Sequence, residues 1–168
     1  MKKVLFVCSG NVFRSLIAHE CLKDYLKKNQ IKGIEVYSAG VNPKKDSSNN
    51  LTREDLKEEG IVFRHKPKKV TKRLIEKNDL IISMGKNHQK FLKEKFGVNS
   101  VLFNKIAYNN SKSVLDIGEK YPFLLKISKK EIKKQKEYIY HINWTVKYIS
   151  KGTPKLANKI IKLFFPGN

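Results

Sequence analysis

The chain has 168 residues, of which 40% are hydrophobic and 30% are charged; this size and composition fit one globular domain and exclude a disordered chain. Its longest apolar runs, V-L-F-V and L-I-I-S-M, are far shorter than the roughly 18–20 residues of a transmembrane helix. The net charge of +21 comes mainly from lysines spread along the chain. This pattern indicates a solvated basic surface that attracts polyanions and predicts no specific nucleic-acid site.

The N-terminal apolar stretch is too short for the hydrophobic region of a signal peptide, so we expect a cytoplasmic protein. Two cysteines, Cys8 and Cys21, allow one disulfide at most. The four histidines are scattered and have no zinc-site spacing, so we expect no metal and no cofactor. The sequence leaves the oligomeric state open.

Hydrophobic periodicity and turn residues define the expected elements in chain order. They are strands over 3–8, 34–38, 79–84 and 100–103, helices over 15–28, 52–60, 71–77, 86–95 and 128–150, a loop over 41–50 and an irregular segment over 107–122. This alternation predicts an α/β fold in which helices cover both faces of a four-stranded parallel sheet. Ligands of such sheets bind beyond the carboxyl ends of strands, and Cys8 ends the first one.

The chain is expected to form a single domain over 1–168, with a short basic amphipathic C-terminal extension over 153–168. Residues 152–154, G-T-P, are expected to end the long helix. Lysines flank the apolar face of the segment, which consists of Leu156, Ile160, Leu163 and Phe164. Such a face can pack on the domain or make weak peripheral contact with a membrane.

The turn after the first predicted strand has the composition of an anion-binding loop. Cys8 ends the strand, Gly10 and Asn11 follow, and Arg14 and Ser15 open a helix. The free amide N–H groups of such a turn and the helix dipole attract a tetrahedral anion and favour a thiolate. C-x-x-x-x-x-R-S in this position therefore predicts a cysteine nucleophile beneath a phosphate; a buried structural cysteine beside a capped helix is the alternative.

The residue types in this turn suit the predicted chemistry. Gly10 permits close approach of the backbone, and Asn11 tolerates the left-handed region. Arg14 presents a planar fork that matches two phosphate oxygens. Ser15 can donate a hydrogen bond to the sulfur of Cys8.

The stretch V-L-F-V-C-S-G-N-V-F-R-S-L-I-A resembles the signature of the low-molecular-weight protein tyrosine phosphatases. The resemblance extends to Y-S-A-G at 37–40, E-G-I-V-F-R-H at 59–65 and D-L-I-I-S-M at 79–84, and it weakens after Phe103. It implies a four-stranded parallel sheet with a phosphate-binding loop after the first strand. It also implies metal-free hydrolysis of phosphate monoesters, from a phosphorylated protein or a small molecule, through a phosphocysteine.

Carried over residue by residue, the resemblance implies that Cys8 is the nucleophile and Arg14 the phosphate clamp. Asn11 would hold the loop, and Ser15 would stabilise the thiolate as a leaving group. The loop amides would bind phosphate oxygens; they belong to Ser9, Gly10, Asn11, Val12, Phe13 and Arg14.

The general-acid loop departs from the family pattern, because the family has an aspartate in D-I-x-D-P-[YF] and this chain has D-I-G-E-K-Y-P. Aligned on D-I, Glu119 takes the place of the acid, Lys120 that of the proline and Tyr121 that of the aromatic residue. Asp116 is the chemically conservative alternative. Both carboxylates can also be ordinary loop charges.

Other departures bear on redox protection and substrate. Phe13 replaces the second cysteine of the loop, so we expect weaker reversible protection of Cys8, with Cys21 in the core. Val12 stands where tyrosine-specific members have a bulky aliphatic residue and arginine-specific members have threonine, which favours phosphotyrosine. Phe13 and Tyr121 would pack on its ring, and lysines in the loop over 41–50 would suit an acidic phosphopeptide.

Three further functions stay open. A protein-arginine phosphatase and an arsenate reductase share the fold, although a reductase would need a thiol relay for which Cys21 is the available partner. A phosphate- or polyanion-binding protein with a weakened active site is the third, suggested by the net charge of +21 and the altered acid loop.

Overall fold

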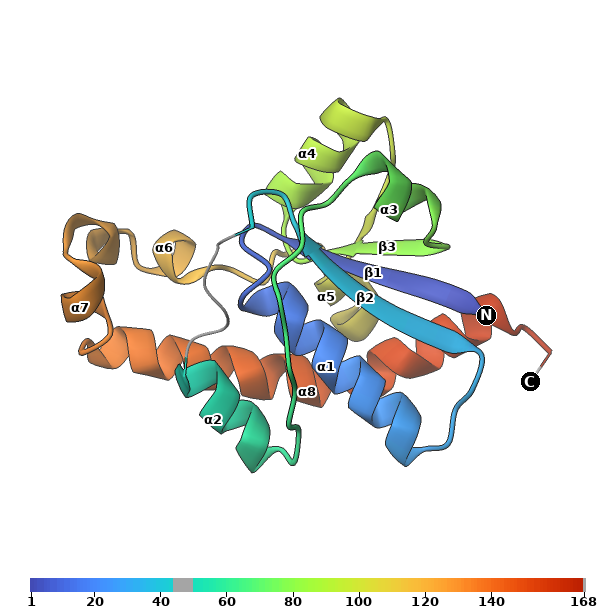
Figure 1. Cartoon of the computed structure of the whole chain (residues 1–168), viewed down its shortest axis with the longest axis horizontal. Coiled ribbons are helices and arrows are strands. Elements are labelled where there is room, and N and C mark those ends of the chain that lie inside the picture. The colour runs from blue at the N-terminus through green and yellow to red at the C-terminus, as the bar shows by residue number, and fades with distance from the viewer. Residues whose placement is uncertain (44–49, 168) are drawn as a thin grey trace.

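The computed structural model of the chain describes residues 1–43 and 50–167 (Figure 1). The expected loop over 41–50, with its lysines Lys44 and Lys45, therefore lies largely outside the described residues. The structure contains a parallel four-stranded sheet in the order β2-β1-β3-β4. Its strands are β1 (Lys2–Cys8), β2 (Ile34–Gly40), β3 (Leu80–Ser83) and β4 (Val101–Leu102). The predicted fold class is confirmed.

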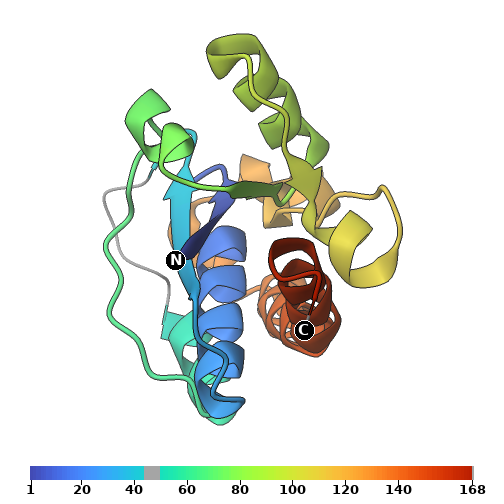
Figure 2. The same ribbon diagram turned by 90° about the vertical axis from the view of Figure 1, so that its right-hand side faces the viewer.

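Helices cover both faces of the sheet (Figure 2). Their bounds are α1 (Arg14–Lys28), α2 (Asn50–Glu58), α3 (Lys72–Glu76), α4 (Lys86–Phe96), α5 (Phe103–Tyr108), α6 (Ile117–Lys120), α7 (Lys129–Ile132) and α8 (Lys136–Phe164), with a 3-10 turn η1 (Pro122–Lys126). The core on one face lies against α1, α2, α5 and α8, and the core on the other lies against α3 and α4. Both faces of β1 are therefore buried, which explains the continuous apolar run V-L-F-V in this strand.

The alternation of side chains along β1 decides where the sulfur lies. Val4, Phe6 and Cys8 belong to the core beneath α1 and α8, whereas Leu5 and Val7 belong to the opposite core. Cys8 is the last residue of the strand, where its backbone is in register with Gly40 of β2. The cysteine thus lies at the carboxyl edge of the sheet, below the N-terminus of α1.

Local signals placed several helix ends correctly. The Thr71 side chain accepts a hydrogen bond from the amide of Leu74 at 3.2 Å and caps α3. Gly97 ends α4 with a φ of 71°, and Gly60, with a φ of 78°, follows α2. These positive angles suit glycine, which lacks the Cβ that penalises them.

The C-terminal third differs from the prediction. The Ser128 capping box opens the four-residue α7, and the long helix α8 begins only at Lys136. Residues 152–154 do not end it, since α8 continues to Phe164. Ile142, Val146 and Ile149 on the inner face of α8 are buried, whereas Ile139 is 37% exposed. Helix α5 was not predicted, because its six residues give too short a periodic pattern.

The segment over 153–168 was expected as a short amphipathic extension that follows the end of the long helix. Its first twelve residues are the last turns of α8. Leu156 and Ile160 are buried in the main core, whereas Leu163 is 62% exposed. The apolar face that a membrane contact would use is therefore largely covered by the protein itself. Along 1–43 and 50–167, no helix combines the length and apolarity needed to span a bilayer.

Candidate active site

The sulfur of Cys8 lies at the bottom of the turn between β1 and α1 and is surrounded by donors. Ser15 Oγ is 2.9 Å from the sulfur, and the amide of Asn11 donates to it at 3.3 Å. Because Ser15 Oγ also accepts from the Asn11 side-chain amide at 3.0 Å, its own proton is free to point at the sulfur. The sulfur therefore lies within hydrogen-bonding distance of a hydroxyl and a backbone amide of the same turn.

Asn11 connects the turn, by hydrogen bonds, to residues that are distant in the sequence. It is fully buried and has a φ of 52°, the left-handed conformation expected for it. Its side-chain oxygen accepts from the amide of Lys68 at 2.9 Å, and its carbonyl oxygen lies 2.6 Å from His65 Nε2. These long-range contacts fix the backbone of the loop before a ligand binds.

Arg14 is buried inside the site, with 1% of its surface exposed. Its Nη1 donates to the carbonyl of Val114 at 2.9 Å, and its Nη2 donates to Ser9 Oγ at 3.3 Å. Its Nε is buried and has no hydrogen-bond partner. A buried guanidinium donor without an acceptor is costly, and a phosphate oxygen above the loop would supply the missing acceptor.

Both candidate acids reach Arg14. Asp116 Oδ2 is 2.7 Å from Nη2, and Glu119 Oε2 is 3.2 Å from Nη1. The two residues form a capping box on α6, in which Asp116 accepts from the amide of Ile117 at 2.8 Å and Glu119 from the amide of Asp116 at 2.6 Å. Both carboxylates are therefore paired with Arg14 in this structure.

His88 completes the site and was not predicted to belong to it. Its Nε2 lies 2.9 Å from Ser9 Oγ, the same hydroxyl that accepts from Arg14. Burial, with a smaller contribution from Arg14, lowers the pKa of His88 to about 4. The imidazole is therefore neutral near pH 7 and adds no charge that would repel Arg14.

Aromatic side chains form the outer wall of the site. The ring centroids of Tyr121 and Phe13 lie 6.0 and 6.1 Å from that of His141 on α8. His141 Nε2 is also 3.2 Å from the carbonyl of Leu115, next to Asp116. His141 thus connects the phosphate loop, the acid loop and α8. Val12 is half-buried beside Phe13.

Sequence reasoning missed the parts of the site that come from distant segments. The histidines His88 and His141 and the carbonyl of Val114 have no local pattern that announces their contacts. Position 88 falls on a predicted helix after a predicted strand, which places it at the carboxyl edge of the sheet. That placement is the one signal by which His88 could have been found.

The second cysteine lies outside this arrangement of donors. Cys21 is buried in the core beneath α1 and, like Cys8, forms no disulfide. Burial raises the pKa of its thiol to about 12. Cys21 is therefore a core residue, as predicted.

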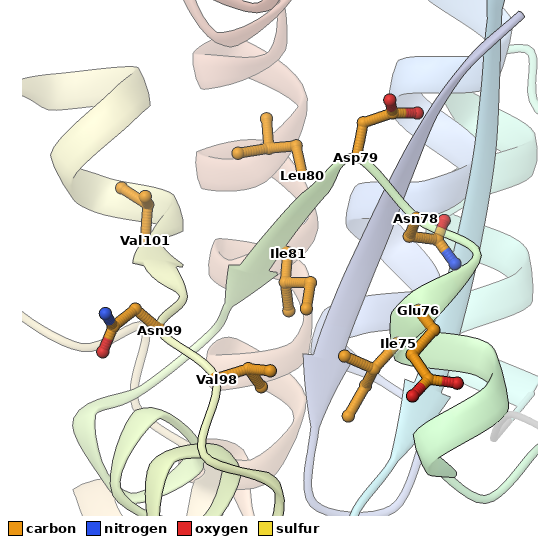
Figure 3. Close-up of a pocket in the computed structure, with 9 residues that line it drawn as sticks. All are labelled: Ile75, Glu76, Asn78, Asp79, Leu80, Ile81, Val98, Asn99 and Val101. Carbon is orange, nitrogen blue, oxygen red and sulfur yellow. The ribbon is translucent and has the colours of Figure 1, made fainter.

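The site is separate from a pocket at the opposite end of the sheet. A pocket of about 380 Å³ lies at the amino ends of β3 and β4, and its lining includes Ile75, Asp79 and Val98 (Figure 3). Cys8 is at the opposite, carboxyl end of the sheet. No residue of the predicted site lines this pocket.

The comparison with protein families agrees with this geometry. The family model for the low molecular weight phosphotyrosine protein phosphatases matches residues 3–147. The chain belongs to this family, and the resemblance found in its sequence is confirmed.

Individual relatives are more distant. The chain is 33% identical over 95 residues to a protein-arginine-phosphatase of Geobacillus stearothermophilus; the match covers 56% of this chain and 62%, about three fifths, of the relative. The arginine phosphatase structure from the same organism has a TM-score of 0.78 at 22% identity and covers 100% of this chain and 98% of its own. The crystal structure of YfkJ from Bacillus subtilis has a TM-score of 0.75 at 23% identity and covers 97% of this chain and 96% of its own. The solution structure of a low molecular weight protein tyrosine phosphatase from the same organism has a TM-score of 0.75 at 22% identity and covers 95% of this chain and 97% of its own. These structures share the fold with the chain.

Proposed function

We propose that the protein is a phosphatase that hydrolyses phosphate monoesters of proteins through a phosphocysteine, with phosphotyrosine as the preferred substrate. One observation carries the proposal. The Cys8 sulfur accepts hydrogen bonds at the floor of a loop whose far end is the buried Arg14, and Arg14 keeps an unpartnered donor. This combination suits a bound tetrahedral dianion and serves no evident purpose in packing.

The reaction takes place in two steps. The Cys8 thiolate attacks phosphorus while the bond to the leaving oxygen breaks, and the loop amides and Arg14 stabilise the charge on the equatorial oxygens. An acid protonates the leaving phenolate. Water then attacks the phosphocysteine with the same group as base, and the thiolate leaves, stabilised by Ser15.

We assign the acid to Glu119 and a positioning role to Asp116. Both oxygens of Asp116 accept short hydrogen bonds, from Ile117 and Arg14 at 2.8 and 2.7 Å. Glu119 Oε1 has only a 3.3 Å contact with the Asn87 side chain. The freer oxygen is therefore on Glu119, at the place that the family alignment gives to the acid. An acid must exchange its proton, whereas a positioning carboxylate has to stay ionised.

Val12, Phe13 and Tyr121 support phosphotyrosine as substrate. They provide an aliphatic and aromatic wall beside the loop, on which a phenyl ring can pack. Phosphoarginine is the second candidate, because the relative from Geobacillus stearothermophilus is named a protein-arginine-phosphatase. An arsenate reductase is disfavoured, since Cys21 is buried and the pKa of its thiol is raised to about 12, so it is a poor relay thiol.

The compartment proposed for this activity is the cytoplasm. The mechanism requires a free thiolate at Cys8, and both cysteines are free. Reducing compartments preserve such thiols.

The decisive experiment compares wild type and Cys8→Ser on p-nitrophenyl phosphate, a phosphotyrosyl peptide and a phosphoarginyl peptide. We expect turnover by the wild type, loss of turnover in the variant, and a higher kcat/KM for phosphotyrosine than for phosphoarginine. Cys21→Ser is the matched control and should retain activity. Binding of phosphate without turnover would instead identify a phosphate-binding protein with a weakened site. A reversed preference would make phosphoarginine the substrate.

A further inference from the structure

A row of aromatic rings leads away from the acid loop along α8. Successive ring centroids are between 4.6 and 6.4 Å apart. We call this set the aromatic row; in order, its members are Phe123, Tyr121, His141, Trp144, Tyr148 and Tyr108. Helix α6, which Tyr121 directly follows, is in contact with α8, which carries His141.

Part of the aromatic row is open to solvent. Phe123 is 51% exposed and Trp144 is 42% exposed, and Tyr140, one helical turn before Trp144, is 63% exposed. Aromatic side chains gathered on a surface mark interaction sites more often than scattered apolar residues do. Trp and Tyr are also the residues that contribute most binding energy at interfaces.

The aromatic row is continuous with the candidate active site. Tyr121 is two residues after Glu119, and His141 touches both Tyr121 and Phe13 of the phosphate loop. From Tyr121, two ring-to-ring steps of 6.0 and 6.4 Å lead to Trp144. About four residues of extended peptide span such a path at ~3.3 Å each. When the phosphorylated residue of a polypeptide enters the loop, residues that flank it in the sequence can therefore reach Trp144.

The charges around the aromatic row select an acidic partner. Lys147, Lys151 and Lys155 are exposed and continue the Trp144 face of α8 at helical spacing, and Lys120 precedes Tyr121. A second copy of this chain would carry the same net charge of +21 and would be repelled. An acidic peptide is attracted to the same surface.

We propose that the aromatic row is the docking surface for the residues that flank the phosphorylated residue of an acidic phosphoprotein. An aromatic or aliphatic side chain about four residues away packs on Trp144, and neighbouring carboxylates face the lysines of α8. The proposal rests on the proposed function, because it assigns the substrate class of the same site.

Trp144 itself supplies the first test, since it is the single tryptophan of the chain. Cys8→Ser protein, which cannot form the phosphocysteine, is titrated with two phosphotyrosyl peptides while tryptophan fluorescence is recorded. One peptide has acidic residues and a phenylalanine four positions from the phosphotyrosine; in the other, Gly and Ser replace them. We expect a saturable fluorescence change with the first peptide and at least tenfold weaker binding of the second.

Kinetics supply the second test. For Trp144→Ala, the ratio of kcat/KM for the acidic peptide to kcat/KM for p-nitrophenyl phosphate should fall about tenfold, the usual size of an aromatic contact with its burial. Trp144→Phe, which keeps a ring, should restore most of that ratio. Lys151→Glu should lower it as well. The controls on the same helix are Leu163→Ser and Lys159→Glu, which should leave the ratio unchanged.

Three results would overturn the docking surface. The first is equal binding of both peptides, and the second is an unchanged ratio of the two kcat/KM values in Trp144→Ala and Lys151→Glu. The third is that Trp144→Ala loses binding to anionic lipid vesicles while the ratio stays intact, which would make the aromatic row a membrane contact. Failure of the proposed function looks different, because wild type would then not turn over p-nitrophenyl phosphate. The fluorescence titration still tests the docking surface in that case.

Discussion

At Arg14 two carboxylates approach one guanidinium, and the proposed roles of Asp116 and Glu119 rest on the difference in their hydrogen bonds. Asp116 and Glu119 contact Nη2 and Nη1, while Nε keeps its donor unpaired. The sequence predicts Cys8 as nucleophile and Arg14 as phosphate clamp, because the spacing between them is local. It left the acid open, because the two carboxylates are three residues apart and either can face inward from a short helix.

Exchange of each carboxylate for its amide separates the acid from the positioning residue. Glu119→Gln should lower kcat for a phosphotyrosyl peptide by about 10²–10⁴ and abolish the basic limb of the pH–rate profile. The loss should be smaller for p-nitrophenyl phosphate, whose leaving group needs less protonation. Asp116→Asn should raise KM more than it lowers kcat, because it weakens the positioning of Arg14. A flattened basic limb in Asp116→Asn and not in Glu119→Gln would reverse the assignment.

His88 predicts a pH dependence of stability. Its pKa is lowered to about 4 in the folded protein, first by burial, whereas a histidine in the unfolded chain titrates near 6.5. Between these values the unfolded chain binds more protons, so stability is full above pH 6.5 and falls as the pH drops towards 4. The free energy of unfolding falls by at most about 1.4 kcal/mol for each unit by which folding lowers the pKa of His88.

Urea unfolding at pH 7, 6, 5 and 4.5 measures this slope. His88→Gln should have a flatter slope than wild type, because its side chain does not titrate. Lys90→Gln is an exposed change on the same helix and should keep the wild-type slope. Identical slopes for all three proteins would contradict the linkage.

At the scale of elements, packing between segments decides what local patterns cannot. The strand, turn and helix around Cys8 were predictable because each has its own signal. The end of the long helix was not, since Pro154 lies inside α8. An internal proline costs about 3 kcal/mol, but a buried Leu or Ile contributes about 1.5–3 kcal/mol. The burial of Leu156 and Ile160 therefore offsets the proline.

At the end of β2, packing between segments also decides which residue can stand beside the phosphate loop. A Cβ on Gly40 would lie 2.7 Å from the carbonyl oxygen of Ser9 and 3.0 Å from the amide nitrogen of Asn11. Gly40 also accepts from the amide of Val70 at 2.9 Å, which holds it in place. The phosphate loop can pack on β2 because residue 40 has no side chain.

Gly40→Ala should therefore displace the loop and lower kcat/KM by up to about 10²-fold, the effect of misplacing reacting groups by about 1 Å. Gly167→Ala is the matched control, since its Cβ would meet nothing within 4 Å. Steady-state kinetics on p-nitrophenyl phosphate measure both variants. Wild-type activity in Gly40→Ala would show that the loop tolerates the shift.

At the scale of the whole molecule, fold class followed from the sequence because alternating strands and helices admit few arrangements. The charge distribution adds a property that no single element has. With 36 basic and 15 acidic residues, the folded chain repels itself, and salt screens this repulsion over a Debye length of about 8 Å at physiological ionic strength. Anions that bind at Arg14 would stabilise the fold in addition to screening.

Thermal or urea unfolding in chloride and in phosphate at matched ionic strength separates the two effects. Chloride should raise the free energy of unfolding gradually, through screening alone. Phosphate should add a saturable increment, about 2.7 kcal/mol at a hundred times its Kd, because the loop binds it only in the folded state. In Arg14→Lys the chloride response should remain and the phosphate increment should shrink, since an ammonium lacks the planar fork. Equal stabilisation by both anions in the wild type would mean that the loop does not bind phosphate.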